Sequence, residues 1–527
     1  MRYGFVIDHN RCIGCHACTV ACKEEHNVPL GVFRTWVKYI EKGEFPHTSR
    51  HFGVMRCNHC DDAPCIEICP TRALFRRNDG IVDFDNNRCI GCNSCMQACP
   101  YDALYLDPAT HTAAKCNFCA HRIEMNLEPA CVIVCPTRAI IAGDIDNPES
   151  DISQIIATQK VAARKPQKGT RPKLFYAGIE GDLLQPSMME PEPSYLFAEH
   201  HPDANLHTNG SLRNAARSNP GAARVVYDVP HPQPWGSIPA FYLWTKSIAA
   251  GVLIVTALLF GVLALPVPAP GGQFLFTILA PIAALLFTGI TTLLLIADLH
   301  RPERFYYILL KPNPHSWLVA GTWILILYSI LAAVWLGCGI VFTGSVRLPI
   351  IIAAAIAGAF SAGYSAFLFA QAKGRDLWQS PLFLWHLLVQ AIVAGAAIVI
   401  LLAVLDGYPH IADAADGGRG IIWASNFLLI GGLVLSILMV LGELLLTPFS
   451  ADAHHAAEMI LRGRLHNMFW LGVVVLGTGA PAGLLLYALA ADAVSVPLEV
   501  LAAVLSLVGL LLFDKVWIIA GQAAPLS

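Results

Sequence analysis

Sixteen of the seventeen cysteines of this 527-residue chain lie before residue 136, in four groups of four. The first and third groups have the spacing C-x2-C-x2-C-x3-C, typical of iron–sulfur ligand runs in which the fourth cysteine binds the other cluster of a pair. Three groups end in Cys-Pro. We therefore predict iron–sulfur ligation, with enough thiolates for four [4Fe–4S] clusters. In chain order the groups are Cys12, Cys15, Cys18 and Cys22; Cys57, Cys60, Cys65 and Cys69; Cys89, Cys92, Cys95 and Cys99; and Cys116, Cys119, Cys131 and Cys135.

Two other uses of closely spaced cysteines remain as alternatives. A structural zinc site needs four ligands, usually in two knuckles, and has no use for the third cysteine of a C-x-x-C-x-x-C run. Disulfides are typical of small secreted domains, and no signal peptide precedes the first group. The spacing favours iron–sulfur clusters over both.

Short strands and polar turns are expected to position the cysteines. Apolar stretches at Gly4–Ile7 and Ile81–Phe84 precede the first and third groups. The sequence Asn-Arg-Cys-Ile-Gly-Cys occurs at 10–15 and again at 87–92, which indicates a duplicated unit. We predict an α+β, ferredoxin-like duplicated 4Fe-4S domain over residues 1–180, stabilised largely by its metal.

The second half of the chain has the composition of a membrane domain. Charged residues become rare after residue 237, and a helix that crosses a bilayer needs ~20 apolar residues. We predict an all-α eight-helix transmembrane bundle over 238–527, embedded in the lipid bilayer, and a linker or partner-docking arm over 181–237. The eight apolar stretches are 239–264, 274–297, 317–342, 349–371, 381–404, 421–446, 467–490 and 498–520.

The basic residues of the loops predict the orientation. Loops on the N-terminal side carry seven of them, and the opposite loops carry only Arg347 and Arg419. Cytoplasmic loops are rich in lysine and arginine, so the iron–sulfur domain is expected on the cytoplasmic side. The lack of a twin-arginine leader agrees with this. The seven are Arg301, Arg304, Lys311, Lys373, Arg375, Arg462 and Arg464.

Ionisable residues within or beside the apolar stretches are candidate functional residues. Lys246, Asp298, His386 and Glu443 all fall toward the N-terminal face of the predicted bundle, where a quinone headgroup would find hydrogen-bond partners and a proton donor. The alternative is structural, because residues near helix ends reach the lipid headgroups or form interfacial ion pairs. Asp514 in the last stretch is a further candidate.

Together these residues resemble a known pair of modules. The cysteine-rich domain resembles the electron-transfer subunits of the dimethyl sulfoxide reductase and polysulfide reductase families. The apolar half resembles the NrfD/PsrC-type polysulfide reductase membrane subunit. The resemblance is carried by the cysteine groups, by the sequence Asp-Leu-His-Arg-Pro-Glu-Arg-Phe at 298–305 and by Ala-Gly-Gln at 520–522. Two modules that are usually separate chains are fused here.

The resemblance implies a ligand set for each cluster. One set is Cys12, Cys15, Cys18 and Cys135; the second is Cys116, Cys119, Cys131 and Cys22; the third is Cys57, Cys60, Cys65 and Cys99; the fourth is Cys89, Cys92, Cys95 and Cys69. It also implies a molybdopterin-containing catalytic subunit as partner, a quinone (menaquinone or ubiquinone) as cofactor, and the bacterial inner membrane as location.

Other functions remain possible from the sequence. The same electron-transfer path serves a hydrogenase or a multihaem cytochrome in one alternative, and a redox-driven proton pump in another. We expect no catalytic residue in this chain beyond a quinone redox site, and no nucleic-acid partner.

Overall fold

The computed structural model describes residues 1–44, 46–179, 184, 186, 189, 223–262, 274–341, 346–406, 417–446, 450–490 and 495–527. The chain divides into two compact units, Met1–Pro234 together with Pro525–Ser527, and Trp235–Ala524. The predicted linker covers residues 181–237. Of these, residues 181–222 lie outside the described residues, except for 184, 186 and 189. Its last part is ordered, because Arg224–Tyr227 forms strand β11 within the first unit.

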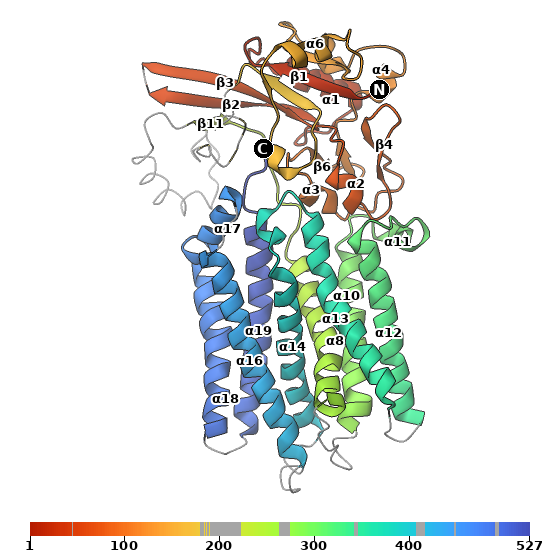
Figure 1. The fold of residues 1–527 in the computed structure, drawn as a ribbon, viewed down its shortest axis with the longest axis vertical. Coiled ribbons are helices and arrows are strands. Elements are labelled where there is room, and N and C mark those ends of the chain that lie inside the picture. Colours follow the sequence, from red (N-terminus) through yellow and green to blue (C-terminus); the bar gives the residue numbers. More distant parts are fainter. Residues whose placement is uncertain are drawn as a thin grey trace. The chain divides into compact units, whose positions relative to one another are not determined.

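A four-stranded sheet lies at the centre of the first unit, in the order β8-β1-β10-β9 (Figure 1). Strand β1 (Tyr3–Asp8) is parallel to β10 (Leu174–Ala177) and antiparallel to β8 (Ile140–Asp144), and β9 (Val161–Ala162) pairs with β10. Residues Phe5 and Ile7 enter one apolar cluster and Val6 another, so β1 is covered on both faces. The strand predicted at Gly4–Ile7 is confirmed.

A second sheet has the order β11-β2-β3, with β2 (Thr35–Glu44) and β3 (His47–Arg56) forming a long antiparallel hairpin. Beside it, His231 lies between two carboxylates, with Nδ1 2.5 Å from Asp102 and Nε2 3.3 Å from Asp228. Burial alone would lower the pKa of His231, but hydrogen bonds to both carboxylates raise it to about 9. Its ring lies 5.8 Å from that of Trp36.

Two hairpins separate the second, third and fourth cysteine groups along the chain, and short helices lie within or beside the groups. The hairpins are β4 (Leu74–Arg76) with β5 (Val82–Phe84), and β6 (Leu104–Leu106) with β7 (Ala113–Lys115). The helices are α1 (Ala17–His26), α2 (Pro64–Ile68), α3 (Ser94–Ala98), α4 (Ala120–Ile123) and α5 (Ala130–Ile133). A further helix, α6 (Asp151–Thr158), is capped by Ser150, whose hydroxyl accepts a hydrogen bond from the Ser153 amide. The arrangement is the α+β fold that was predicted.

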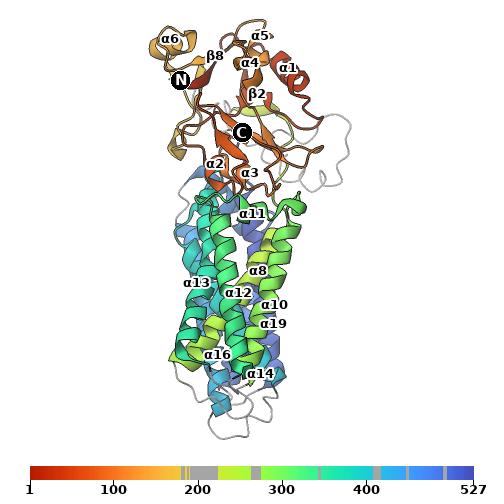
Figure 2. The ribbon, with the colours of Figure 1, turned by 90° about the vertical axis from the view of Figure 1, so that its right-hand side faces the viewer.

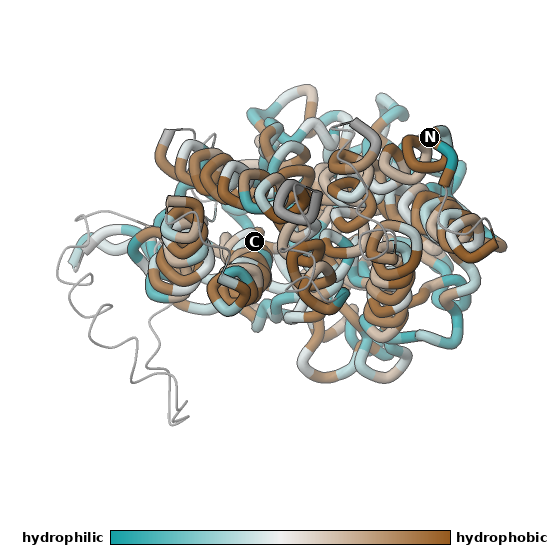
Figure 3. Tube along the Cα trace, turned by 90° about the horizontal axis from the view of Figure 1, so that it is seen from below, coloured by the Kyte–Doolittle hydropathy of each residue, from teal (hydrophilic) through white to brown (hydrophobic). Residues whose placement is uncertain are grey.

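In the part of the second unit that the structure describes, eight helices are long and apolar enough to cross a membrane, as predicted (Figures 1 and 2). They are mainly hydrophobic around their circumference when viewed end-on (Figure 3), as expected for helices that face lipid or each other. The spans are Ile238–Phe260 (α8 up to Ala257), Leu275–Ala297 (α10 from Ala280), Trp317–Val341 (α12), Leu348–Gln371 (α13), Phe383–Leu405 (α14), Ile421–Leu445 (in α16, Gly417–Leu446), Met468–Ala490 (α18 from Ala480) and Val496–Gly521 (α19). Short helices α11 (Tyr307–Leu310) and α17 (Ala451–Leu461) lie in the connections.

Helices α8 and α14 form the centre of this bundle. Helix α8 packs against α10, α13 and α14, and α14 also packs against α16 and α19. Two glycines allow a close approach: a Cβ atom on Gly251 would lie 1.9 Å from the carbonyl oxygen of Ala391, and one on Gly395 would lie 2.1 Å from that of Gly251. Small residues at such contacts are typical of membrane helices, where association depends on close packing.

Candidate functional site

The second and third cysteine groups exchange their last members. Cys57, Cys60 and Cys65 line a pocket together with Cys99 of the third group. A neighbouring pocket is lined by the other three cysteines of the third group, Cys89, Cys92 and Cys95, together with Cys69 of the second. Each pocket therefore has four thiols from two groups, which is the arrangement that a cubane cluster requires.

The first and fourth groups are related in the same way. Cys22 lies among fourth-group thiols: burial, and then Cys116, Cys131 and Cys119, raise the pKa of its thiol. Metal binding would offset this cost, since a metal-bound thiol is deprotonated.

Cys12 has the complementary neighbours. Burial raises the pKa of its thiol, and the Cys135 and Cys15 thiols add to that effect. Burial also raises the pKa of Cys18 to about 11, with Cys12 among the thiols that contribute. Cys135, Cys15 and Cys12 are the neighbours that the family resemblance implies for the first cluster, while Cys131, which raises the pKa of Cys18 more than Cys12 does, belongs to another ligand set.

The geometry differs from that of zinc or disulfide sites. None of the seventeen cysteines, all of which are within the described residues, forms a disulfide. Among the described residues, no three His, Cys, Asp or Glu side chains converge on a position for one metal ion. A tetrahedral zinc site needs four ligands around one ion, whereas the second and third groups line two pockets with four thiols each, which fit a multi-iron cluster.

The repeated sequence adopts the same backbone conformation twice. Gly14 and Gly91 both have positive φ, 69° and 70°, and are followed two residues later by His16 and Asn93 with φ of 59° and 56°. Glycine accepts this left-handed conformation without the cost that a Cβ imposes. The two loops therefore turn their cysteines in the same way and support the predicted duplication.

Hydrogen bonds to sulfur occur in the third and fourth cysteine groups. Backbone amides donate to cysteine sulfurs, from Ala113 to Cys89 at 3.4 Å and from Ala139 to Cys135 at 3.2 Å. Hydrogen bonds to the sulfurs are among the factors that set cluster potentials.

Two cationic or potentially cationic side chains also contact sulfur. The imidazole Nε2 of His26 lies 3.2 Å from the Sγ of Cys119, and the Arg56 guanidinium donates to the Sγ of Cys131 at 3.1 Å. Such contacts add to the amide hydrogen bonds in adjusting a cluster's environment.

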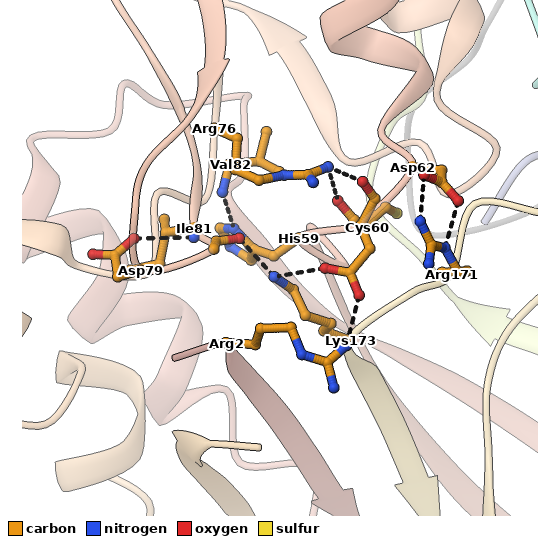
Figure 4. Close-up of polar contacts among 12 residues, drawn as sticks. Arg2, His59, Cys60, Asp62, Arg76, Asp79, Ile81, Val82, Arg171 and Lys173 are labelled. Carbon is orange, nitrogen blue, oxygen red and sulfur yellow. Dashed lines mark hydrogen bonds and ion pairs between the residues drawn. The ribbon is translucent and has the colours of Figure 1, made fainter. Parts of the chain in front are cut away.

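Ion pairs hold the loop that follows Cys60 (Figure 4). Arg171 pairs with Asp62, with two nitrogen–oxygen distances of 2.5 and 2.7 Å. Arg76 donates to the Cys60 carbonyl at 3.1 Å, and the Val82 amide donates to Nδ1 of His59 at 3.2 Å. The two strands that follow are thereby attached to the loop that carries the second group.

In the membrane unit, Lys246 lies in a buried polar cluster. Its side chain is fully buried, donates to the Ser365 hydroxyl, lies 4.5 Å from the centre of the Tyr364 ring and interacts electrostatically with Asp514. Asp514 in turn accepts a hydrogen bond of 2.8 Å from Gln390. The cluster joins helices α8, α13, α14 and α19.

The other three predicted residues, Asp298, His386 and Glu443, have different surroundings. Asp298, half-buried at the end of α10, interacts electrostatically with Tyr242 of α8, as Asp514 does. His386 is 3% exposed, one turn before Gln390 on α14. The centre of its ring lies 4.4 Å from that of Phe513, with the planes tilted by 48°, and neither ring nitrogen has a hydrogen-bond partner among the described residues. Glu443 is 8% exposed and interacts with Ser380 instead.

Several site residues were not predicted from the sequence. Ser365, Tyr364 and Gln390 are uncharged, and uncharged polar residues in an apolar helix give only a weak signal. Arg56 directly precedes a cysteine, but nothing in the sequence shows that its side chain is buried. The contact of Glu443 with Ser380 also depends on helix packing alone.

Comparison with known proteins identifies both units. Residues 226–525, more than half of the chain, match the family described as polysulphide reductase, NrfD. The chain belongs to this family. Residues 49–145 of this NrfD-family protein match the 4Fe-4S dicluster domain, so the predicted fusion of an iron–sulfur module with an NrfD module is confirmed.

The N-terminal part of this NrfD-family protein is similar to components of several reductases. It is 45% identical over 197 residues to a tetrathionate reductase subunit of Salmonella typhimurium, covering 37% of this chain and 79% of the relative. It is 42% identical over 177 residues to one of the polysulfide reductase chains of Wolinella succinogenes (33% and 93%). It is 35% identical over 226 residues to the arsenate respiratory reductase iron-sulfur subunit ArrB of a Shewanella species (33% and 96%).

These similarities and the eight helices establish the general function. The NrfD-family protein is a multi-pass membrane protein with an iron–sulfur domain. It serves in electron transfer and membrane anchoring.

Proposed function

We propose that this chain conducts electrons through four [4Fe–4S] clusters between a catalytic partner subunit and a membrane quinone. The four ligand sets are those implied by the family resemblance, each with three cysteines of one group and one of another. The observation that supports them most directly is the exchange of Cys69 and Cys99 between the two pockets. Iron–sulfur clusters placed in succession are a conductor that needs no substrate pocket in this chain.

We place the quinone site at the end of the bundle where α8 begins and α19 ends, and assign it Lys246, Asp298, His386 and Glu443. The buried imidazole of His386 supports this assignment most strongly. A buried polar group without a hydrogen bond costs roughly 1–3 kcal/mol, and a quinone carbonyl or hydroxyl would supply the missing partner. Asp298 and the Lys246 cluster offer groups that can exchange protons when the quinone changes its oxidation state.

The partner is proposed to be a large molybdopterin-containing subunit. The relatives are named as components of tetrathionate, polysulfide and arsenate reductases, and the last of them as an iron-sulfur subunit. The arginine and lysine residues of the loops support the bacterial inner membrane, with the iron–sulfur unit on the cytoplasmic side.

Purification of the native complex tests the electron-transfer path. Iron and acid-labile sulfide corresponding to four clusters, with molybdenum or tungsten in a large partner subunit, are the expected result. Fewer clusters would contradict the ligand sets, and nickel or haem in place of molybdenum or tungsten would point to a hydrogenase or a multihaem cytochrome as partner.

The quinone site is tested in membrane vesicles with the full complex. A quinol should reduce the clusters in the unchanged protein, and His386→Phe should slow this reduction while dithionite still reduces the clusters fully. Lys311→Met, which removes an exposed cation at the same end of the bundle, is the matched control. Equal quinol-dependent rates in both variants would remove His386 from the quinone site.

A further inference from the structure

Arg56 is a buried cation between two of the proposed cluster positions. It is the last residue of strand β3, and its side chain is 0% exposed. One terminal nitrogen, Nη1, donates a hydrogen bond of 3.1 Å to the Sγ of Cys131. The guanidinium lies 4.6 Å from the centre of the Phe5 ring, which holds it in place.

The rest of the guanidinium has no partner of opposite charge. Its Nε and Nη2 atoms are buried without a hydrogen bond, and no carboxylate pairs with Arg56 among the residues that the structure describes. Arginine remains charged in proteins, so this position holds a full positive charge. A buried charge is costly unless a nearby negative charge compensates it.

The negative charge that fits this position is sulfur-bound. The Arg56 guanidinium interacts electrostatically with Cys131 and Cys116 of the fourth group and with Cys18 of the first. In the proposed ligand sets, Cys116 and Cys131 belong to one cluster and Cys18 to the next. Arg56 therefore lies against both, with the hydrogen bond on the side of Cys131.

We propose that Arg56 is a potential-tuning residue, which makes the cluster held by Cys116, Cys119, Cys131 and Cys22 easier to reduce. The inference rests on the proposed ligand sets. Reduction adds one electron, and therefore one negative charge, to the cluster. A fixed positive charge attracts that added charge strongly in a buried site of low dielectric constant, and the hydrogen bond to a ligand sulfur acts in the same direction.

The effect on the neighbouring cluster is weaker. Cys18 interacts with the same guanidinium, but the hydrogen bond goes to Cys131. The cluster that includes Cys18 should therefore shift in the same direction by a smaller amount. Such a difference would favour electrons residing on the cluster held by Cys116, Cys119, Cys131 and Cys22.

Two substitutions separate the charge of Arg56 from its volume. Arg56→Met removes the charge and retains much of the length, whereas Arg56→Lys keeps a charge but lacks the planar guanidinium. Arg50→Met is the matched control, because Arg50 lies on the same strand, is 54% exposed and pairs with Glu41 at the surface. The cluster potentials of all three variants are measured in the full complex by anaerobic redox titration, in which electron paramagnetic resonance detects the reduced clusters.

We expect at least a tenfold loss in the equilibrium constant for reducing one cluster in Arg56→Met, which is a fall of about 59 mV for one electron. Arg56→Lys should fall less, and Arg50→Met should not change. Potentials in Arg56→Met equal to those of the unchanged protein, at full iron content, would overturn the proposal.

A measurement on the unchanged protein covers the case in which Arg56→Met fails to assemble. Protein labelled with 15N-arginine should show hyperfine coupling between an arginine nitrogen and a reduced cluster, and its absence would also overturn the proposal. The iron and sulfide content of the unchanged protein tests the cluster number separately. A shortage there would count against the proposed ligand sets rather than against Arg56.

Discussion

Replacing Lys246 by methionine is expected to destabilise the membrane unit by about 3–5 kcal/mol, the cost of leaving a buried charge, the Asp514 carboxylate, without a compensating charge. Lys246 is fully buried and interacts with Asp514, the Ser365 hydroxyl and the Tyr364 ring. Its removal leaves the Asp514 carboxylate with the Gln390 amide as a partner. Loss of a hydrogen bond alone between membrane helices would cost only about 0.6 kcal/mol.

The size of the destabilisation therefore distinguishes an uncompensated buried charge from the loss of a single hydrogen bond. In the double variant Lys246→Met with Asp514→Asn, no charge remains unpaired. The double variant should be more stable than the sum of the two single effects predicts, by about 1–3 kcal/mol, a coupling expected of residues in contact.

The protein is unfolded in detergent, and its loss of helix is monitored by circular dichroism, which reports mainly on the membrane helices. Lys311→Met is the control, because this lysine also lies over a tyrosine ring, 4.8 Å from the centre of Tyr307, but is exposed. It should cost less than about 1 kcal/mol. Additive effects of the Lys246 and Asp514 substitutions would refute a buried charge pair.

Three further predictions concern packing, pH and ligation. Gly251→Ala should reduce the yield of folded protein, because its Cβ would lie 1.9 Å from the Ala391 carbonyl oxygen, whereas Gly289→Ala, with no atom within 4 Å, should be tolerated; equal yields would contradict the close helix contact. Because folding raises the pKa of His231 from 6.5 to about 9, its contribution to stability, about 2–3 kcal/mol, should be complete below pH ~6.5 and lost as the pH rises through about 9. Unfolding midpoints from pH 6 to 10 should show this loss, and His231→Gln should flatten the profile. Cys99→Ser should alter the cluster of the second cysteine group and leave that of the third intact by electron paramagnetic resonance; the reverse would refute the exchanged ligand sets.

Sequence alone predicted the features that depend on local spacing. The cysteine groups, the strand at the start of the chain and the eight spans follow from short-range patterns. The span predicted at 317–342 corresponds to Trp317–Val341, and the other seven predicted spans begin within two residues of the observed ones. Apolar stretches of this length leave a membrane helix few alternatives.

Features that join distant residues were not predictable in this way. The pairing of β11 with β2 occurs in a region whose composition resembles a linker. The burial of Arg56 depends on Phe5 and Cys131, which are far from it in sequence. Lys246 and Asp514 are each recognisable as ionisable residues in apolar helices, but their proximity results from the packing of α8 and α19.

The exchanged cysteines also have a consequence for the order of assembly. The proposed ligand sets are nested along the chain: Cys57 to Cys99 lies inside Cys22 to Cys131, which lies inside Cys12 to Cys135. The innermost loops close over the shortest stretches of chain, and closing a long loop costs more entropy than closing a short one. Thus the first cysteines to leave the ribosome would be the last to complete a cluster. A polypeptide cut short between Cys99 and Cys131 could complete the two inner clusters but neither of the outer two.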